Sequence, residues 1–408
     1  MKILQVNVVY DVGSTGKITA DLHRQLLKSG HESVVCTSRL QHTEDPNVIN
    51  LCGVHYSHMN AAINCVTGFH HGGCHLSTRK LMGIIEKEKP DIVHLQCING
   101  AFVNVYKLMA WLNQQKIKTV CTLHAEFMYT GGCAHSKECD RWKHGCKNCP
   151  RYRQEARSLL FNQAHIVWKR LHKAVKDFDT LTLVPVSCWS GSRVAQSPIY
   201  AGVPQKVIHN GINTGNFEVC DRSLTEELKK RYGIDPDKKI VLHVTPLFSS
   251  PVKGGEYFSA LVERLPKNYQ AVVVGYDGPP TDKFIGIRFL KDQKQLAAFY
   301  AMADVFVITS KVDTYPTVCL EANCCGTPAV GFDVCGVKET IGEGMGEVVK
   351  PFDLDAMLEK VLYWSENKGN IPQETVNARM AYCTKERMLE DYLSLYREIL
   401  SGDNTKER

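Results

Sequence analysis

Asp313-Thr-Tyr-Pro-Thr-Val-Cys-Leu-Glu321 joins a predicted strand to a predicted helix. The residues before it, 304–310, are apolar and β-branched, which is typical of a buried strand. From Val318 the pattern indicates a helix that Gly326 ends, and residues 328–332 predict the next strand. Two carboxylates therefore lie at a strand–loop–helix corner, the building unit of a parallel α/β sheet.

This corner has the chemistry to bind a nucleotide-sugar. We expect Thr317 to cap the helix, whose free N–H groups and dipole favour a phosphate group. Glu321 lies about one turn into the helix, and its two oxygens can accept hydrogen bonds from two sugar hydroxyls at once. The alternative is a capped helix with two solvated carboxylates in an ordinary α/β domain.

The stretch resembles the acid-x7-acid signature of the retaining family 4 glycosyltransferases, also called glycosyl transferases group 1. In that family the first acid is usually Glu, whereas this chain has Asp313; Glu321 and the trailing Gly326-Thr-Pro328 match. The resemblance implies an α/β protein with the GT-B fold, in which two doubly wound Rossmann-like domains face each other across a cleft. A chain of 408 residues is long enough for two or more domains.

The resemblance divides the chain into an acceptor-side half and a donor-side half. The turn Asn210-Gly-Ile-Asn213 resembles the family's Asn-Gly-Ile-Asp turn, which leads into the linker. The predicted parts are an N-terminal Rossmann-like domain at 1–215 with a cysteine-rich insertion at 131–150, a nucleotide-sugar-binding domain at 216–385, and a C-terminal helix that crosses back, with the tail, at 386–408.

Composition narrows the class of protein. The chain is 44% hydrophobic and 23% charged, an ordinary balance for a globular enzyme. It contains no apolar run of about 18–20 residues and no signal-peptide pattern at its start, so we expect a cytoplasmic protein whose 17 cysteines are reduced. The net charge of +6 suits an anionic donor or an anionic membrane surface and does not favour nucleic acid as a partner.

A glycine-containing loop, Gly13-Ser14-Thr15-Gly16, follows the first predicted strand. It matches neither the Walker P-loop nor the dinucleotide fingerprint, because Asp11 and Ile18 occupy positions that a P-loop fills otherwise. Its glycines let the backbone approach a phosphate, although a simple tight turn explains them equally well. Family members carry such a loop beside the donor diphosphate, so we expect this one to bind the donor.

His124 and Lys253 are two further candidate site residues. His124 ends the predicted strand 118–124, where it faces the ligand crevice of a parallel sheet or is a core histidine bound by backbone. Lys253-Gly at a helix start suits an anion. The family implies that the histidine lies beside the transferred sugar and that the lysine holds the diphosphate together with an arginine. This chain has no arginine in that region, where Leu247 and Phe248 stand instead.

Four cysteines, with the spacing Cys133-x5-Cys139-x6-Cys146-x2-Cys149, lie in the predicted insertion. Four thiolates so close in sequence can surround one tetrahedral zinc ion, while a reduced loop with incidental cysteines is an equal alternative. Related transferases share such a cluster. We therefore keep a structural zinc ion as a hypothesis for this segment, without a catalytic metal.

Three other features leave alternatives open. Residues 151–178 predict one long amphipathic helix with a basic face, which docks on an anionic membrane or packs on the sheet. His70 and His71 suggest an acceptor-side loop or a metal tract, and loop composition alone also explains them. Three Asp-x-Asp pairs predict helix caps and turns: Asp177/Asp179, Asp235/Asp237 and Asp353/Asp355.

Together these features predict a retaining transferase that moves a hexose from a UDP- or GDP-sugar to a glycan or lipid-linked acceptor in polysaccharide or lipopolysaccharide assembly, with contact to the cytoplasmic face of the inner membrane. Catalysis would need no cofactor. The alternatives are a nucleotide-sugar epimerase of the same fold and a weakly active sugar-nucleotide-binding protein. The predicted catalytic residues are His124, Lys253, Asp313 and Glu321. The predicted donor-binding residues are Gly13, Ser14, Thr15, Gly16, Lys253, Asp313, Thr317, Val318 and Glu321.

Overall fold

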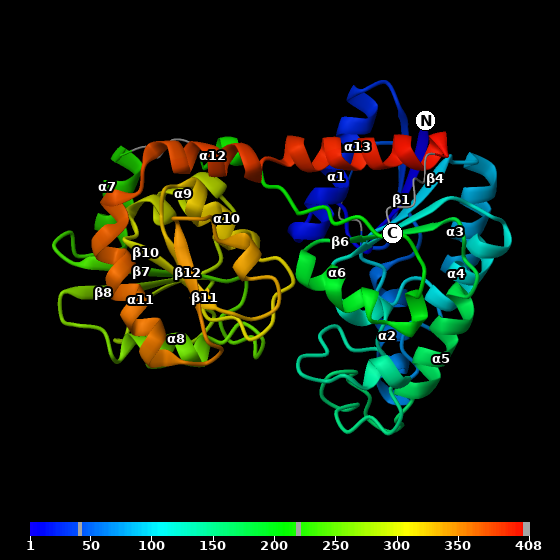
Figure 1. Cartoon of the computed structure of the whole chain (residues 1–408), viewed down its shortest axis with the longest axis horizontal. Coiled ribbons are helices and arrows are strands. Elements are labelled where there is room, and N and C mark those ends of the chain that lie inside the picture. Colours follow the sequence, from blue (N-terminus) through cyan, green and yellow to red (C-terminus); the bar gives the residue numbers. More distant parts are fainter. Residues whose placement is uncertain (40–42, 218–221, 403–408) are drawn as a thin grey trace. The chain divides into compact units, whose positions relative to one another are not determined.

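The computed structural model describes residues 1–39, 43–217 and 222–402. It contains two compact units, each an α/β layer structure (Figure 1). The first unit comprises Met1–His209 and the chain from Leu389 onward, and the second comprises Asn210–Met388. Residues 403–408 of the predicted C-terminal segment lie outside the described residues.

The first unit contains a six-stranded parallel sheet in the order β3-β2-β1-β4-β5-β6. Its strands are near-continuous apolar runs because helices cover both faces of such a sheet. The strands are β1 Lys2–Val6, β2 Glu32–Thr37, β3 Val48–Asn50, β4 Ile92–Leu95, β5 Thr119–Leu123 and β6 Leu181–Pro185. The helices are α1 Gly13–Lys28, α2 Val54–Thr67, α3 His75–Glu88, α4 Val105–Gln114, α5 Ala164–Val175 and α6 Cys188–Ala195.

The second unit repeats this architecture, with a parallel sheet in the order β12-β11-β10-β7-β8-β9. Its strands are β7 Lys239–Val244, β8 Tyr269–Val274, β9 Ile285–Ile287, β10 Val305–Ile308, β11 Ala329–Phe332 and β12 Gly346–Val349. Its helices are α7 Arg222–Tyr232, α8 Gly255–Val262, α9 Gln293–Met302, α10 Thr317–Cys324, α11 Leu354–Asn367 and α12 Gln373–Cys383, followed by α13 Lys385–Ser401. The 3-10 helices of the two units are Glu126–Met128, Arg141–His144, Pro198–Tyr200, Thr214–Asn216, Lys338–Thr340 and Lys368–Asn370.

The strand order reverses direction once in each sheet. In the second unit β7 and β10 are neighbours, and the chain leaves them toward opposite sides of the sheet order. Loops that follow two such strands diverge, and ligands bind in the crevice between them. The loops after β7 and β10 carry Lys253 and Asp313, so the topology brings these two side chains to one end of the sheet.

The C-terminal helix α13 contributes to the core of the first unit. Tyr392 and Tyr396 on this helix are fully buried. The hydroxyl of Tyr396 lies 2.6 Å from Nδ1 of His94 on β4, and the hydroxyl of Tyr392 lies 3.0 Å from Oγ1 of Thr122 on β5. The first unit is therefore completed by a segment that follows the whole second unit in sequence.

Two predicted segments have different bounds in the structure. Helix α1 begins at Gly13, so much of the predicted glycine loop forms the first turn of this helix. The long helix predicted at 151–178 is wrong, because only Ala164–Val175 forms α5. Residues before it are held outside a helix: Leu159 N–H donates to the carbonyl of Cys65 at 2.7 Å, and Arg157 has φ +50.

Candidate functional site

Helix α10 carries the acidic stretch in the second unit, after the loop that follows β10. Pro316 rather than Thr317 is its N-cap, and Thr317 is its first helical residue, so the expected threonine cap is wrong. Proline fits this position because its extended backbone (φ −71, ψ 111) leads directly into the helix. Its ring offers no oxygen to the first-turn amides, which include those of Thr317 and Val318.

Lys253 and Asp313 form an ion pair at the carboxyl end of the sheet. The Nζ atom of Lys253 lies 2.7 Å from Oδ2 of Asp313, and both side chains are partly buried. The backbone N–H of Gly336 donates to the carbonyl of Asp313 at 3.1 Å, which fixes the loop after β10. The structure thus joins two residues, 60 positions apart, that the sequence assigned to the donor site.

Glu321 lies on α10, one turn after its start. Its Oε2 accepts a hydrogen bond of 2.9 Å from the hydroxyl of Tyr300 on α9. Tyr300 is fully buried, and burial, with Glu321 adding to it, raises the pKa of this phenol far above its ordinary value. Tyr300 therefore stays a neutral donor that orients the carboxylate. Sequence reasoning missed Tyr300, because in a predicted helix it looks like any other core aromatic residue.

His124 directly follows β5, in the first unit, as predicted. Its Nε2 lies 3.0 Å from Oε1 of Gln96, which directly follows β4. Burial lowers the pKa of His124 to about 4, so the imidazole is neutral near pH 7. Gln96 is a second residue that sequence reasoning did not select, although its place after a strand is the same signal that selected His124.

The segment Gly13–Gly16 forms the start of α1. Gly13 has φ +66, and Gly16 packs so closely that an added Cβ would lie 3.1 Å from the Val9 side chain. Asn7 Nδ2 donates to the carbonyl of Thr15 at 3.0 Å. The amides of Ser14 and Thr15 lie in the first helical turn, after the first strand of the sheet. This is again a helix start at the carboxyl end of a parallel strand.

Glu126 holds the cysteine-rich insertion in place. Its buried carboxylate accepts hydrogen bonds from Arg193 Nε at 2.8 Å, the Tyr129 hydroxyl at 2.7 Å and the Ser136 hydroxyl at 2.9 Å. Arg193 also lies over the ring of the buried Trp142. Glu126, two residues after His124, therefore has a structural role in this chain.

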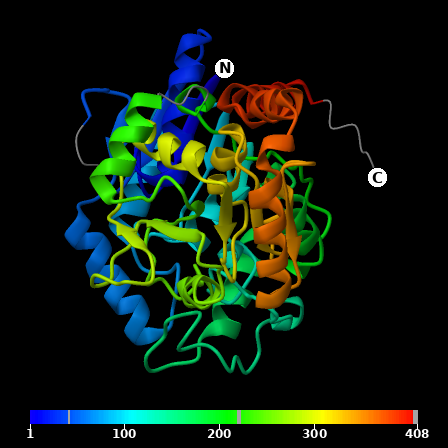
Figure 2. The same ribbon diagram turned by 90° about the vertical axis from the view of Figure 1, so that its left-hand side faces the viewer.

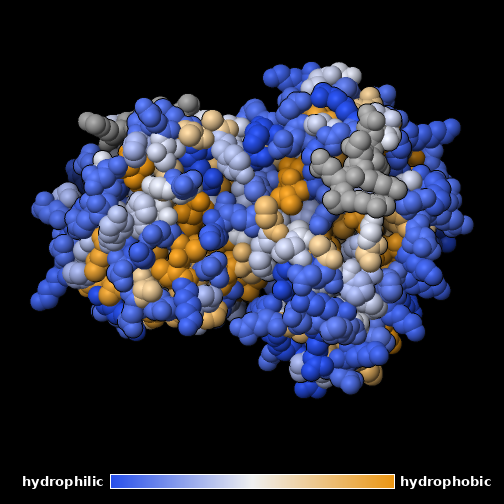
Figure 3. Space-filling view, viewed as in Figure 1, coloured by the Kyte–Doolittle hydropathy of each residue, from blue (hydrophilic) through white to orange (hydrophobic). Residues whose placement is uncertain are grey.

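The four cysteines at positions 133, 139, 146 and 149 come close together within this insertion. The surface at the bottom of the first unit in Figure 3 is mostly hydrophilic. All four are free thiols. Burial raises the pKa of Cys133, Cys146 and Cys149, and the neighbouring thiols of the cluster add to this rise. The backbone at Gly131 and Arg151 opposes the rise for Cys146 and Cys149.

The same cysteines are not drawn together as tightly as zinc would hold them. Within the described insertion, no three of their sulfur atoms lie within 4.8 Å of one another. The donor set therefore fits a tetrahedral zinc ion by its chemistry, and binding would require the loop to contract.

His70 and His71 do not form a pair of metal ligands in the structure. Their ring centroids lie 6.2 Å apart, and His71 packs at 5.1 Å against Phe127 in the core. Burial lowers the pKa of His71 to about 3. Whether this segment contacts an acceptor stays a prediction.

The Asp-x-Asp pairs lie at helix starts and turns, as expected. Asp353 caps α11 by accepting a hydrogen bond from Ala356 N–H at 3.0 Å, and Asp235 accepts one from Asp237 N–H at 3.0 Å. Asp179 forms a surface ion pair with Lys116.

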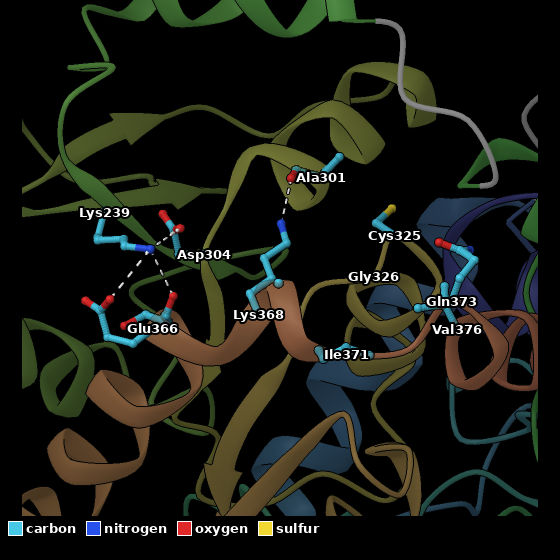
Figure 4. A pocket seen from close by; sticks show the side chains of 12 residues that line it. Lys239, Ala301, Asp304, Cys325, Gly326, Glu366, Lys368, Ile371, Gln373 and Val376 are labelled. Carbon is cyan, nitrogen blue, oxygen red and sulfur yellow. Dashed lines mark hydrogen bonds and ion pairs between the residues drawn. The ribbon is translucent and has the colours of Figure 1, made fainter.

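The second unit also has a pocket of about 430 Å³ at the amino ends of β7 and β10 (Figure 4). Lys239 binds Asp304 at 3.2 Å, and Lys368 donates to the carbonyls of Ala301 and Ala303 at 2.8 and 2.6 Å. Both ammonium groups are therefore bound by protein groups around the pocket. The pocket lies at the amino ends of the strands, whereas Lys253 and Asp313 lie at their carboxyl ends. It is therefore not the candidate site.

The two-unit fold is shared with solved glycosyltransferase-like structures. A sucrose-phosphate synthase from Thermosynechococcus elongatus has the same fold, with a TM-score of 0.66 and 17% identity over 98% of this chain and 99% of that one. The Anabaena protein HepE, solved in complex with UDP-glucose, has a TM-score of 0.64 and 16% identity over 98% and 100% of the two chains. These likenesses establish the GT-B fold.

Sequence comparison establishes the family. The model of Glycosyltransferase Family 4 matches residues 15–216, and that of Glycosyl transferases group 1 matches residues 225–385. The chain belongs to these family 4, group 1 glycosyltransferases. It is 23% identical to an N-acetyl-alpha-D-glucosaminyl L-malate synthase from Bacillus anthracis over 96% of each chain. It is 22% identical to the putative colanic acid biosynthesis glycosyl transferase WcaC from Escherichia coli, over 98% of this chain and 100% of that one.

Among the described residues, no helix is both long enough and apolar enough to cross a lipid bilayer.

Proposed function

We propose that this protein is a retaining glycosyltransferase that moves a hexose from a UDP- or GDP-sugar to a glycan or lipid-linked acceptor in the assembly of a cell-surface polysaccharide. The observation that carries the proposal is the Lys253–Asp313 pair beside the start of α10, with Glu321 one turn further on. A cation, free amides and oriented carboxylates are the groups that a nucleotide-sugar requires.

The donor would bind mainly to the second unit. The ammonium group of Lys253 and the amides of Thr317 and Val318 would receive the diphosphate, with help from the amides of Gly13–Gly16. Glu321, held by Tyr300, would accept hydrogen bonds from the ribose hydroxyls. Asp313 would bind hydroxyls of the hexose.

Catalysis would be electrostatic. As the bond from the sugar to the diphosphate breaks, negative charge grows on the leaving phosphate, and Lys253 and the helix amides stabilise it. Asp313 already binds Lys253. If it also binds the sugar, it would couple phosphate binding to the position of the sugar. His124, neutral because of its lowered pKa, would orient the sugar as a hydrogen-bonding group rather than as an acid. The reaction would need no metal and no cofactor.

The relatives support the substrate class. WcaC from Escherichia coli and TuaC from Bacillus subtilis are named for colanic acid and teichuronic acid biosynthesis, and WaaG for lipopolysaccharide biosynthesis. The HepE crystals contain UDP-glucose. We further propose that the acceptor is reached at the cytoplasmic face of the inner membrane, with peripheral contact of this protein to that membrane and without nucleic acid as a partner.

The test is thermal stabilisation of the full chain by UDP-, GDP-, ADP- and dTDP-sugars. A ligand that binds only the folded protein stabilises it by roughly 2.7 kcal/mol at 100 times its Kd. We expect stabilisation by one UDP- or GDP-sugar, its loss in Glu321→Ala, and a weaker effect in Tyr300→Phe, which keeps the carboxylate and removes only its orienting hydroxyl.

Three outcomes would contradict parts of the proposal. No stabilisation by any donor would remove the nucleotide-sugar assignment. Binding without transfer to any acceptor would leave a sugar-nucleotide-binding protein. Conversion of the donor without an acceptor would indicate an epimerase, and inversion at the anomeric carbon would exclude the retaining mechanism.

A further inference from the structure

Helix α2 of the first unit buries polar side chains and exposes apolar ones. Its buried residues are polar: Ser57, Asn60 and Asn64. Met59 and Ile63, spaced as neighbours on one helix face, are 55% and 51% exposed. A surface helix ordinarily buries its apolar face, so this arrangement requires a specific reason.

The buried polar residues explain how the helix is held this way. Ser57 Oγ donates to the carbonyl of Gly100 at 2.8 Å, and the Asn60 side chain accepts from Cys74 N–H at 3.1 Å. The inverted orientation is therefore fixed by hydrogen bonds to the rest of the first unit. The helix runs along the outside of that unit, as the mid-blue helix at the edge of Figure 2.

A second apolar segment lies beside the end of α2. Leu159, Leu160 and Phe161 are 61%, 60% and 54% exposed. The segment is tied to α2 because Leu159 N–H donates to the carbonyl of Cys65, the same bond that keeps it out of helix α5. The exposed faces of α2 and of 159–161 thus form one surface, which we call the apolar ridge.

The two chain segments that contain the ridge carry basic residues and no acidic ones. Residues 46–85 and 156–176 contain no Asp or Glu, although the whole chain has 43. Arg170 on α5 lies over the ring of Phe69, 4.4 Å from its centroid, just after the end of α2. The basic residues of the two segments are Arg79, Lys80, Arg157, Lys169, Arg170, Lys173 and Lys176.

We propose that the apolar ridge docks on a membrane that contains anionic lipids. Apolar side chains would enter the boundary between headgroups and acyl chains, while the surrounding Arg and Lys bind lipid phosphates. A second copy of this chain would fit less well, because two such surfaces would bring like charges together. The sequence offered a predicted helix at 151–178 as one possible membrane-docking element. In the structure α5 forms only part of that segment and buries its apolar residues in the core, so the apolar ridge is proposed in its place.

The test is co-sedimentation of the full chain with vesicles of phosphatidylcholine alone and with added phosphatidylglycerol. We expect binding to the anionic vesicles only, weakened by salt. Ile63→Ser and Phe161→Ser should each lower the partition coefficient by roughly 10-fold, because each removes a large apolar side chain from the interface. Phe289→Ser is the matched control, since Phe289 is 61% exposed in the second unit.

Charge is tested separately. Lys169→Glu/Lys173→Glu should reduce binding to anionic vesicles, and Lys267→Glu/Lys291→Glu in the second unit, with the same change in net charge, should not.

Equal effects of both pairs, or no binding of the wild type to any vesicle, would overturn the proposal. Concentration-dependent dimerisation that Phe161→Ser abolishes would also overturn it, in favour of a second copy. Stabilisation by nucleotide-sugar is measured on the same variants and should be unchanged, so failure of this proposal is distinct from failure of the donor assignment.

Discussion

At the scale of single residues, the Lys253–Asp313 pair is the centre of the candidate site. Neither residue is unusual in sequence, since a lysine before a glycine and an aspartate in a loop are common surface features. Their separation of 2.7 Å makes each the other's partner in this structure. In the proposed function the carboxylate would have a second partner, the sugar of the donor.

This leads to a prediction for the two partners. Lys253→Met should lower kcat/KM by roughly 10²–10³, because it removes the cation proposed to act on the leaving phosphate. Asp313→Asn should lower turnover while nucleoside diphosphate binding stays equal or becomes tighter, because Lys253 is then released to the phosphate. Titration with UDP and GDP, set beside steady-state kinetics, separates the two effects.

Lys311→Met is the control for that experiment. Lys311 forms an ion pair with Glu256 in the first turn of α8, close in the fold but outside the candidate site. A comparable loss of activity in this variant would show that general charge, rather than Lys253 itself, supports the reaction.

At the scale of elements, helix α8 begins where the chain passes under the end of β10. Gly254, its N-cap, has φ +68, and a Cβ there would lie 1.9 Å from the carbonyl oxygen of Thr309. Only glycine permits this approach, which positions Lys253 next to Asp313.

We therefore predict that Gly254→Ala destabilises the second unit by about 3 kcal/mol, from both the left-handed backbone and the clash. Gly13→Ala is a matched control, since Gly13 has φ +66 but an added Cβ would meet nothing within 4 Å. Its cost should be near 1 kcal/mol. Urea unfolding of both variants measures the difference, and equal costs would contradict the close-approach argument.

The cysteine-rich insertion allows a second prediction at this scale. Purified protein should contain about one zinc ion per chain by elemental analysis, and Cys146→Ser or Cys149→Ser should lose it. Cys65→Ser, on α2, should retain the metal. The absence of zinc from wild type purified without chelator would reduce the insertion to a loop with incidental thiols.

At the scale of the whole molecule, the buried histidines make stability depend on pH. Burial lowers the pKa of His71 and His94 to about 3, and that of His124 and His243 to about 4. Each folded-state pKa lies below the ordinary value near 6.5, so as pH falls the unfolded chain binds these protons first. Their contribution is complete above pH 6.5 and is lost as pH falls toward 4.

We predict a decrease in unfolding free energy of roughly 1.4 kcal/mol per histidine for each pH unit below 6. Chemical denaturation between pH 5 and 7 measures the slope. His124→Gln should reduce that slope, and His55→Gln, at an exposed position on α2, should leave it unchanged. A flat profile would mean that these imidazoles gain protons without unfolding.

The sequence alone determined the repeating α/β architecture and the main residues of the candidate site. Apolar β-branched runs specify buried parallel strands, and a glycine or a cap between strand and helix specifies where each turns. These are properties of short segments. Lys253, Asp313, Glu321 and His124 were selected from their places near strand ends and helix starts together with the resemblance to the family signature, and their role in donor binding stays a prediction.

Tertiary structure alone decided the partners of these residues and the polarity of the surface. Tyr300 binds Glu321, and Tyr396 binds His94 across 302 positions in sequence, which no local pattern contains. Helix periodicity could not tell that α2 exposes its apolar side or that residues before Ala164 leave the predicted helix. Both outcomes depend on hydrogen bonds to distant segments, because a polar group buried in a fold takes the partner that the fold brings to it.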